Sequence, residues 1–255
     1  LNDDPLEGDL IFVGRGDASF STDNLESLIR EIQKKGIKKI EGNLILNKSY
    51  FGKIPNSIDF DDDPMRAYNV LPNAISIQSN TINFKFKPQN NNVKIEAKPD
   101  LKYLKIKNNL RLSQKNCVSW KQALDYQKAN SIQEEMIIFQ GHLSKKCSNK
   151  EIDLSVIDNG RYFYEVFKYL WVQNGGNFSG GYWVNNNERL EGKLIASHLS
   201  RPLGVLIRDM NKYSLNLMAR NLMLTVIAED LKKQVTEDDV NHFVLDWLGN
   251  QGIAN

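Results

Sequence analysis

The spacing of apolar residues in the first fifty positions changes twice. A short apolar run from Gly8 to Gly14 is bounded by glycines, which is typical of a buried strand. Helical spacing follows at positions 24–35, and Gly36 is expected to end that helix. Alternation then resumes over residues 37–47, where Gly42 interrupts it. The pattern predicts a strand, a helix and a second strand in that order.

From residue 75 to about residue 157 the pattern is mostly that of short strands. Apolar and polar residues alternate there, and turn-forming residues such as Pro88 to Asn92 lie between the runs. The expected strands include residues 75–77, 82–86, 93–95, 101–112, 116–120 and 136–143. This stretch is predicted to form a β-rich module.

Helical spacing returns after residue 158. The expected elements are helices at 162–172, 203–210, 215–231 and 236–248, with one strand at 181–184. Thr236 is a good N-terminal cap because its side-chain oxygen can accept a backbone N–H and the three acidic residues after it suit the positive end of the helix dipole. The predicted fold class is α+β, with a β-rich insertion between two segments that mix helix and strand.

Composition excludes two classes of protein. The 255 residues are 41% hydrophobic and 25% charged, and no stretch reaches the roughly 18 to 20 consecutive apolar residues of a membrane span. The net charge is +2, and the basic residues are scattered rather than concentrated with aromatic residues. A nucleic-acid reader should show a basic face or a recognisable module, so no nucleic-acid partner is expected. The sequence carries no signal for the oligomeric state.

The two cysteines, Cys117 and Cys147, are each flanked by strand-like sequence. We expect a disulfide between neighbouring strands, which would imply an oxidising compartment. The alternative is two unrelated buried thiols. The three histidines, at positions 142, 198 and 242, have no cysteine or carboxylate at ligand spacing, so no metal site is expected. Because the chain begins at Leu1, we expect it to be processed, excised or incompletely represented.

Ser214 and Asn216 lie where one predicted helix ends and the next begins. A hydroxyl and a carboxamide two residues apart can project into one cleft, where the hydroxyl passes a proton and the amide binds a substrate carbonyl. A helix N-cap role explains Ser214 equally well.

The residues around this pair resemble a known family. The runs 196–203 and 210–219 are similar to the segment around the second active-site motif of the low-molecular-mass class C penicillin-binding proteins, which are D-alanyl-D-alanine carboxypeptidases and endopeptidases. The catalytic parts of this clan are Ser-x-x-Lys, Ser-x-Asn and Lys-Thr-Gly. Leu215 departs from the aspartate usual in the middle of the second motif. The stretches 8–17 and 35–44 also resemble the family's opening, so the likeness covers nearly the whole chain.

The resemblance implies a domain organisation and a set of site residues. The chain would be part of a multi-domain, serine β-lactamase-like penicillin-binding protein. Residues 1–74 would form the first part of an inserted recognition domain, and 75–157 an inserted β-rich domain. Residues 158–196 would be the return segment of the inserted domain, and 197–255 the helical part that carries Ser-x-Asn. Ser214 and Asn216 would be catalytic, Asp63 would receive the amino end of the substrate's diamino acid, and Tyr68 would pack on its stem. A solvated acidic loop is the alternative for Asp63 and Tyr68.

The resemblance also implies partners and a location. These would be peptidoglycan stem peptides and β-lactams, with no cofactor, in the periplasm or another exported location of a bacterium. No serine has a lysine three positions later, and there is no Lys-Thr-Gly. Without a base and oxyanion donors a serine hydroxyl cannot acylate, so the chain alone is predicted to be inactive. The alternative is a non-catalytic homologue that binds peptidoglycan or a partner protein.

Overall fold

The computed structural model describes residues 5–52, 61, 63–130, 134–186, 190 and 192–253. It divides into two compact units, which we call the α/β unit and the β module. The α/β unit comprises Leu1–Pro64, Tyr68–Ser79 and Asn159–Asn255, and the β module comprises Met65–Ala67 and Asn80–Asp158. The assignment of recognition and catalytic roles to parts of the chain stays a prediction.

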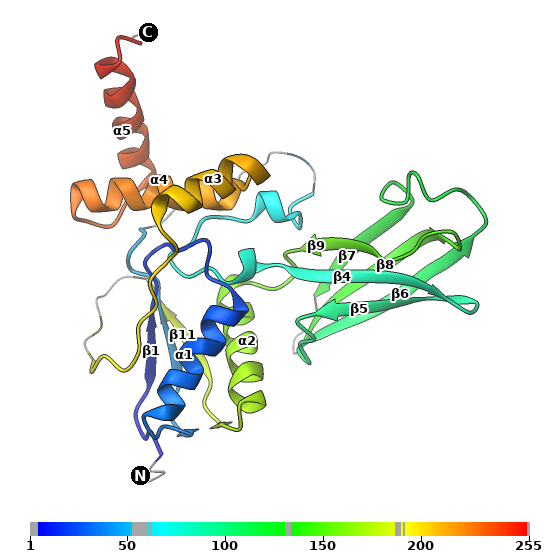
Figure 1. Ribbon diagram of the computed structural model, residues 1–255, viewed down its shortest axis with the longest axis horizontal. Helices are drawn as coiled ribbons and strands as arrows, with labels where there is room; N and C mark the ends of the chain where they lie inside the picture. Colours follow the sequence, from blue (N-terminus) through cyan, green and yellow to red (C-terminus); the bar gives the residue numbers. More distant parts are fainter. Residues whose placement is uncertain are drawn as a thin grey trace. The chain divides into compact units, whose positions relative to one another are not determined.

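A parallel sheet forms the centre of the α/β unit (Figure 1). Its strands β1 (Leu10–Val13), β3 (Leu44–Asn47) and β11 (Tyr182–Asn185) pair in the order β1-β3-β11. Two shorter strands, β2 (Lys39–Ile40) and β10 (Asn177–Phe178), pair beside it. The predicted strand 37–47 is divided around Gly42, where a Cβ atom would lie only 2.3 Å from the carbonyl oxygen of Gly8. The close passage of another backbone therefore requires glycine at this point.

Two helices pack beside this sheet, as the blue and yellow-green ribbons in Figure 1 show. Helix α1 (Thr22–Lys34) connects β1 to the β2–β3 segment, and α2 (Asn159–Gln173) precedes β10. Ser21 and Asn24 form a capping box at the start of α1. The four apolar positions that predicted this helix are all buried: Leu25, Leu28, Ile29 and Ile32. The predicted strand–helix–strand opening is confirmed, because β1 and β3 pair in parallel across α1.

The last third of the chain is helical, as its spacing predicts. It contains α3 (Leu203–Tyr213), α4 (Asn216–Leu231) and α5 (Glu237–Asn250), and the side chain of Thr236 caps α5. A small apolar core joins α4 to the rest of the unit: Phe51, Ala74, Leu224, Ile227, Ala228 and Val235. Among the described helices, none combines the length and apolar character needed to cross a bilayer.

The β module contains two three-stranded sheets (Figure 1). Aromatic rings of the two sheets form a shared core. One sheet has the order β5-β4-β9 and the other β6-β8-β7. Phe84 and Phe86 on β4 contact Phe139 on β8 with ring centroids 5.0 and 5.1 Å apart. All three rings are fully buried. The strands are β4 (Ile82–Gln89), β5 (Asn92–Lys98), β6 (Leu104–Ser113), β7 (Leu124–Asn130), β8 (Glu135–Ser144) and β9 (Lys150–Leu154).

Two short segments at the points where the chain passes between the units are 3₁₀ turns. They are η1 (Ala67–Asn69) and η2 (Gln78–Asn80). The expected strand at 75–77 is absent, since that segment is irregular and leads into η2. Ile75 and Ile77 are nevertheless buried, so alternation at this point reflects burial without strand pairing.

The expected strand at 116–120 is wrong. These residues form a turn, in which the backbone N–H groups of Gln122 and Ala123 donate to the carbonyl of Ser119. The strand begins later, at Leu124. These local hydrogen bonds occupy backbone groups that pairing with a neighbouring strand would need.

The expected disulfide is present and closes this turn onto the end of β8. Cys117 and Cys147 have Cα atoms 5.3 Å apart, within the range that a disulfide bridges. They are separated by 30 positions, for which the loop-entropy estimate is a stabilisation of about 3–4 kcal/mol.

Candidate active-site wall

Ser214 and Asn216 flank the sharp junction between α3 and α4. Ser214 ends α3 in the left-handed conformation, with φ 52° and ψ 50°. Leu215 is the N-cap residue of α4 and its side chain makes no cap hydrogen bond, whereas Asn216 is the first helical residue. The alternative that Ser214 caps α4 is therefore wrong. A left-handed conformation costs a non-glycine residue roughly 1–2 kcal/mol, and such strain gathers at functional sites.

The two polar side chains at this junction remain available for a ligand. Ser214 is exposed and Asn216 is half-buried. Neither side chain makes a hydrogen bond to any other residue that the structure describes. The hydroxyl can donate or accept a proton, and the carboxamide can both donate and accept hydrogen bonds. This pair can therefore orient an amide substrate and move a proton beside it.

Behind this junction, Asn221 anchors α4 to two loops. Its side chain is 0% exposed. The Oδ1 atom accepts the backbone N–H of Asn73 at 3.1 Å, and the Nδ2 atom donates to the carbonyls of Asn73 and Gly16 at 3.0 and 3.2 Å. Buried amides with this many partners hold a helix in one position. The sequence reasoning missed Asn221, although a single amide inside the apolar pattern of residues 215–231 was a usable signal.

Gly16, one of these partners, has a backbone that few other residues could adopt. Its φ is +82°, and a Cβ atom there would lie 2.7 Å from both the Phe51 ring and the Thr225 hydroxyl. Thr225 is on α4, so the loop after β1 lies directly against that helix. Glycine is required here both by conformation and by space.

The acidic loop is organised around Asp61 and Asn69. Asn69 is buried, and its Nδ2 atom donates to Asp61 Oδ1 at 2.6 Å and to the carbonyl of Asp63 at 2.9 Å. The backbone N–H of Asp63 also donates to Asp61 Oδ1 at 3.1 Å, and the Tyr68 hydroxyl donates to Asp61 Oδ2. Asp61 thus holds the loop, and sequence reasoning missed both it and Asn69. Its neighbours at 53–60 and 62, most of the acidic run, lie outside the described residues.

The two predicted substrate-binding residues lie on the surface of this loop. Asp63 is half-buried, and Tyr68 is 39% exposed. The Tyr68 hydroxyl bonds to Asp61, which orients its ring. In the described part of the chain, no hydrogen bond or ion pair joins Asp63 or Tyr68 to Ser214 or Asn216.

Arg220 connects the segment after Tyr68 to α4. The Arg220 guanidinium donates from Nη1 to the carbonyl of Val70 at 3.4 Å, and desolvation lowers the pKa of Arg220. Arg220 lies four residues, about one turn, after Asn216 and therefore on the same side of the helix. The chain segment that follows Tyr68 consequently runs beside the first turns of α4.

A second polar cluster joins α4 to the loops after β1 and β3. Glu229 Oε1 accepts from Arg15 at 2.9 Å and from the Tyr50 hydroxyl at 2.8 Å, and Lys232 lies 3.0 Å from Oε2. These donors, Tyr50 first, lower the pKa of Glu229 to about 2. Burial and the hydrogen bond to Glu229 raise the pKa of Tyr50 to about 12. The guanidinium of Arg15 also lies 4.8 Å from the Tyr50 ring centroid.

His198 has a carboxylate neighbour that its sequence position did not reveal. Its Nε2 atom lies 3.6 Å from Asp17 Oδ2, and its ring meets the edge of Phe20. Packing on Phe20 agrees with the predicted structural role of this histidine. Within the described residues, no group of three or more metal-ligating side chains occurs.

The chain is similar to known proteins along its whole length. The model of the D-Ala-D-Ala carboxypeptidase 3 (S13) family matches residues 1–255. The D-alanyl-D-alanine carboxypeptidase DacB of Haemophilus influenzae is 27% identical over 252 residues, which are 97% of this chain and 51% of that protein. The chain thus spans about half the length of this relative.

Two crystal structures from Haemophilus influenzae share the fold. The structure of penicillin binding protein 4 (dacB) has a TM-score of 0.80 at 24% identity and is covered over 55% of its length. A structure of the same protein complexed with a novel β-lactam has a TM-score of 0.70 at 23% identity and is covered over 53%. Each comparison covers 99% of this chain.

Proposed function

Because this chain belongs to the D-Ala-D-Ala carboxypeptidase 3 (S13) family, we propose that it is part of a serine-type carboxypeptidase or endopeptidase that acts on peptidoglycan peptides. The parent enzyme works through an acyl-enzyme, is sensitive to penicillins, needs no metal or other cofactor and is exported to the bacterial periplasm. The observation that carries this proposal is the exposed Ser214 and Asn216 pair at a strained helix junction, in a chain that matches the family along its whole length.

Ser214 and Asn216 have different roles in this proposal. The Ser214 hydroxyl passes a proton between the catalytic amine and the leaving nitrogen, and the Asn216 amide orients the substrate's peptide group. Both side chains have unused hydrogen-bonding capacity among the described residues, which supports contact with a ligand. Asn221 holds α4 from behind and so fixes the position of Asn216.

The acidic loop recognises the substrate's diamino acid. The Asp63 carboxylate pairs with its ammonium group, and the Tyr68 ring packs on the aliphatic stem. The Asp61–Asn69 network supports this assignment, because it holds the backbone of Asp63 and the hydroxyl of Tyr68 at the same time. A carboxylate facing an ammonium in a partly desolvated groove selects strongly for that charge.

The remaining catalytic parts belong to other segments of the parent protein. Several large apolar side chains on and beside α3–α5 are exposed, which is typical of a surface that other protein covers: Leu199, Leu203, Tyr213, Val226, Leu245 and Trp247. The Ser-x-x-Lys nucleophile and Lys-Thr-Gly would be supplied by the protein that packs there. The 255-residue chain alone is accordingly inactive and takes up no penicillin covalently.

The second candidate is a non-catalytic homologue that binds peptidoglycan or a partner protein. Leu215 supports it, because the family's usual aspartate is absent from the middle of the motif and a leucine that is 38% exposed lies there. This candidate keeps the binding surfaces and loses acylation.

Labelling of the intact parent protein with a fluorescent penicillin separates the two candidates. The enzyme hypothesis expects covalent label, with acylation slowed about 10²–10⁴-fold by Ser214→Ala and about 10²–10³-fold by Asn216→Ala. Ser200→Ala, which removes another exposed hydroxyl, is the matched control and should label at the normal rate. An intact parent that takes up no label, or a Ser214→Ala protein that labels as fast as the control, contradicts the proposal.

A further inference from the structure

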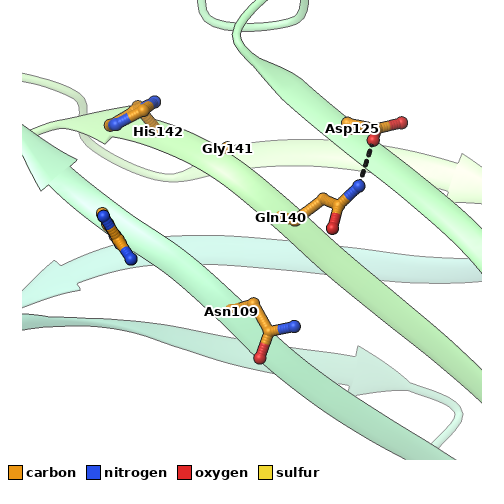
Figure 2. Close-up of a pocket in the computed structure, with 6 residues that line it drawn as sticks. Asn109, Asp125, Gln140, Gly141 and His142 are labelled. Carbon is orange, nitrogen blue, oxygen red and sulfur yellow. Dashed lines mark hydrogen bonds between the residues drawn. The ribbon is translucent and has the colours of Figure 1, made fainter.

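The β module carries a shallow polar hollow of about 450 Å³ on one face of the sheet β6-β8-β7 (Figure 2). It is formed entirely within the β module, whereas Ser214 and Asn216 belong to the α/β unit. The residues that line it are Asn109, Arg111, Asp125, Gln140, Gly141 and His142.

Strand alternation explains why polar side chains gather here. Leu110, Phe139 and Leu143 are buried on the inner face of the sheet, so the residues between them point to the outer face. The strand register places Asn109, Gln140 and Asp125 in one row and Arg111 with His142 in the next. The hollow is therefore two adjacent cross-strand rows of polar side chains, which Figure 2 shows on neighbouring strands.

Gly141, on the central strand β8, allows the residue before β7 to approach that strand closely. Its φ is +104°, and a Cβ atom would lie 2.2 Å from the carbonyl oxygen of Ala123. That carbonyl accepts the backbone N–H of His142 at 2.9 Å. A glycine at such a close approach is typical of a bulge, and bulges often re-aim side chains beside binding sites.

The hydrogen-bonding capacity of the hollow is unevenly used. Gln140 Nε2 donates to Asp125 Oδ2 at 2.5 Å, which holds that carboxylate in place (Figure 2). By contrast, the side chains of Asn109, Arg111 and His142 make no hydrogen bond or ion pair with any described residue. A guanidinium has five N–H donors and no acceptor. Most of the unused hydrogen-bonding groups in the hollow are therefore donors, which a ligand with acceptor atoms would bind.

The charge on this face favours an anionic group. Lys107, Asn109 and Arg111 follow one another at intervals of two residues on β6, so all three side chains point to the outer face. Lys107 is exposed. Asp125 is the single acidic residue among those that line the hollow, and it is already hydrogen-bonded to Gln140. Arginine binds carboxylates through two parallel N–H bonds.

We propose that this hollow binds the terminal carboxylate of a peptide. Arg111 takes the carboxylate, His142 and Asn109 hydrogen-bond beside it, and Asp125 accepts a peptide N–H. Arg111 and Asp125 lie one row apart on the two outer strands of the sheet, with β8 between them, so they contact the peptide at two separate points. The β module would thus hold a peptide end separately from the Ser214 and Asn216 pair.

Titration of the 255-residue chain with N-acetyl-D-alanyl-D-alanine, followed by NMR, tests the proposal. The choice of a D-alanyl probe rests on the proposed function, whereas the site itself does not. We expect binding in the millimolar range, with shifts at β6 and β8, and a loss of at least about tenfold in affinity for Arg111→Ala. The matched control is Arg208→Ala, which removes one exposed guanidinium from the α/β unit and should bind normally.

Three results would overturn the proposal. The first is equal binding of the same peptide with its carboxyl group amidated. The second is unchanged affinity in Arg111→Ala, and the third is no binding up to about 20 mM. A Ser214→Ala, Asn216→Ala double variant should bind the peptide normally at the β module. Failure of penicillin labelling in the parent therefore tests the proposed function without deciding this site.

Discussion

The β module and the helices α3–α5 bury their apolar residues to very different extents. In the module, Phe84, Phe86 and Phe139 are fully buried and contact one another. A disulfide closes the same module. In contrast, α3 and α5 contain no buried residue, although Val240 and Phe243 of α5 are partly buried against the core to which α4 contributes.

This difference indicates that the two regions depend on different sources of stability. The module carries the interactions that it needs within its own sequence, which is the property of an independently stable domain. The helical region is held at α4, while α3 and α5 present apolar side chains such as Leu203 and Trp247 to solvent. Exposed apolar side chains of this kind are typical of a surface that other protein covers, which agrees with the proposed function.

Truncation of the module's central ring should have the largest effect. We expect Phe139→Ala to lower the free energy of unfolding of the β module by about 3–5 kcal/mol, because it leaves a cavity between two sheets. Urea unfolding with hydrogen exchange read separately for each unit measures the change. Gln127→Ala, an exposed change on β7, is the control. Equal loss of exchange protection in the α/β unit would show that the two regions are not independent.

Removal of the buried amide behind the junction of α3 and α4 should have an intermediate effect. Asn221→Ala leaves the Asn73 N–H and two carbonyls without their partner, and we expect a loss of about 2–3 kcal/mol in the α/β unit. Exchange at Asn73 and Gly16 should rise, whereas the β module should be unchanged. Met223→Ala, on an exposed face of α4, provides the comparison. If it proves as damaging as Asn221→Ala, the amide has no special role.

The smallest effect is expected at the exposed Glu229 cluster, and it depends on pH. The pKa of Glu229 is lowered to about 2 from its ordinary 4.5, so its contribution to stability is complete above pH 4.5 and is lost as pH falls toward 2. The pKa of Tyr50 is raised to about 12 from 10, so its contribution is complete below pH 10 and is lost as pH rises toward 12.

Glu229→Gln tests both limbs of this dependence. The difference in thermal midpoint between the natural and variant chains should be constant from pH 5 to 9 and should shrink toward both extremes. Glu237→Gln, on the first turn of α5, is the control for loss of one acidic residue. A difference that does not vary with pH would exclude this ionic contribution.

Local patterns were enough to place most helices. The apolar spacing at Leu25 and Ile29 predicted α1, and Thr236 predicted the start of α5, because both features act within one or two helical turns. The same reasoning failed at residues 116–120, where alternation is short and local turn hydrogen bonds replace pairing. Strand pairing depends on distant partners, so alternation alone gives weaker evidence than helical spacing.

The candidate site shows the same limit. The Ser-x-Asn spacing pointed to Ser214 and Asn216 as functional candidates, and the family resemblance pointed to Asp63 and Tyr68. Neither pattern could show that Asp61 and Asn69 organise the loop, because their bonds depend on how the chain turns between them. Nor could they distinguish a Ser214 that caps α4 from one that ends α3, since both assignments have the same spacing.

By itself, the sequence predicted the main helices, the strand–helix–strand opening, the resemblance to a family and a disulfide between the two cysteines. These follow from periodicity, capping residues and ordered motifs, which are local properties of the chain. Only the tertiary structure decided that β3 lies between β1 and β11, and that Asn221 binds Asn73 and Gly16 across 148 and 205 positions. It also decided that five polar residues and one glycine of three strands form one hollow. The physical reason is that buried hydrogen bonds and cross-strand neighbours are set by which surfaces pack together, and many pairings are compatible with the same local pattern.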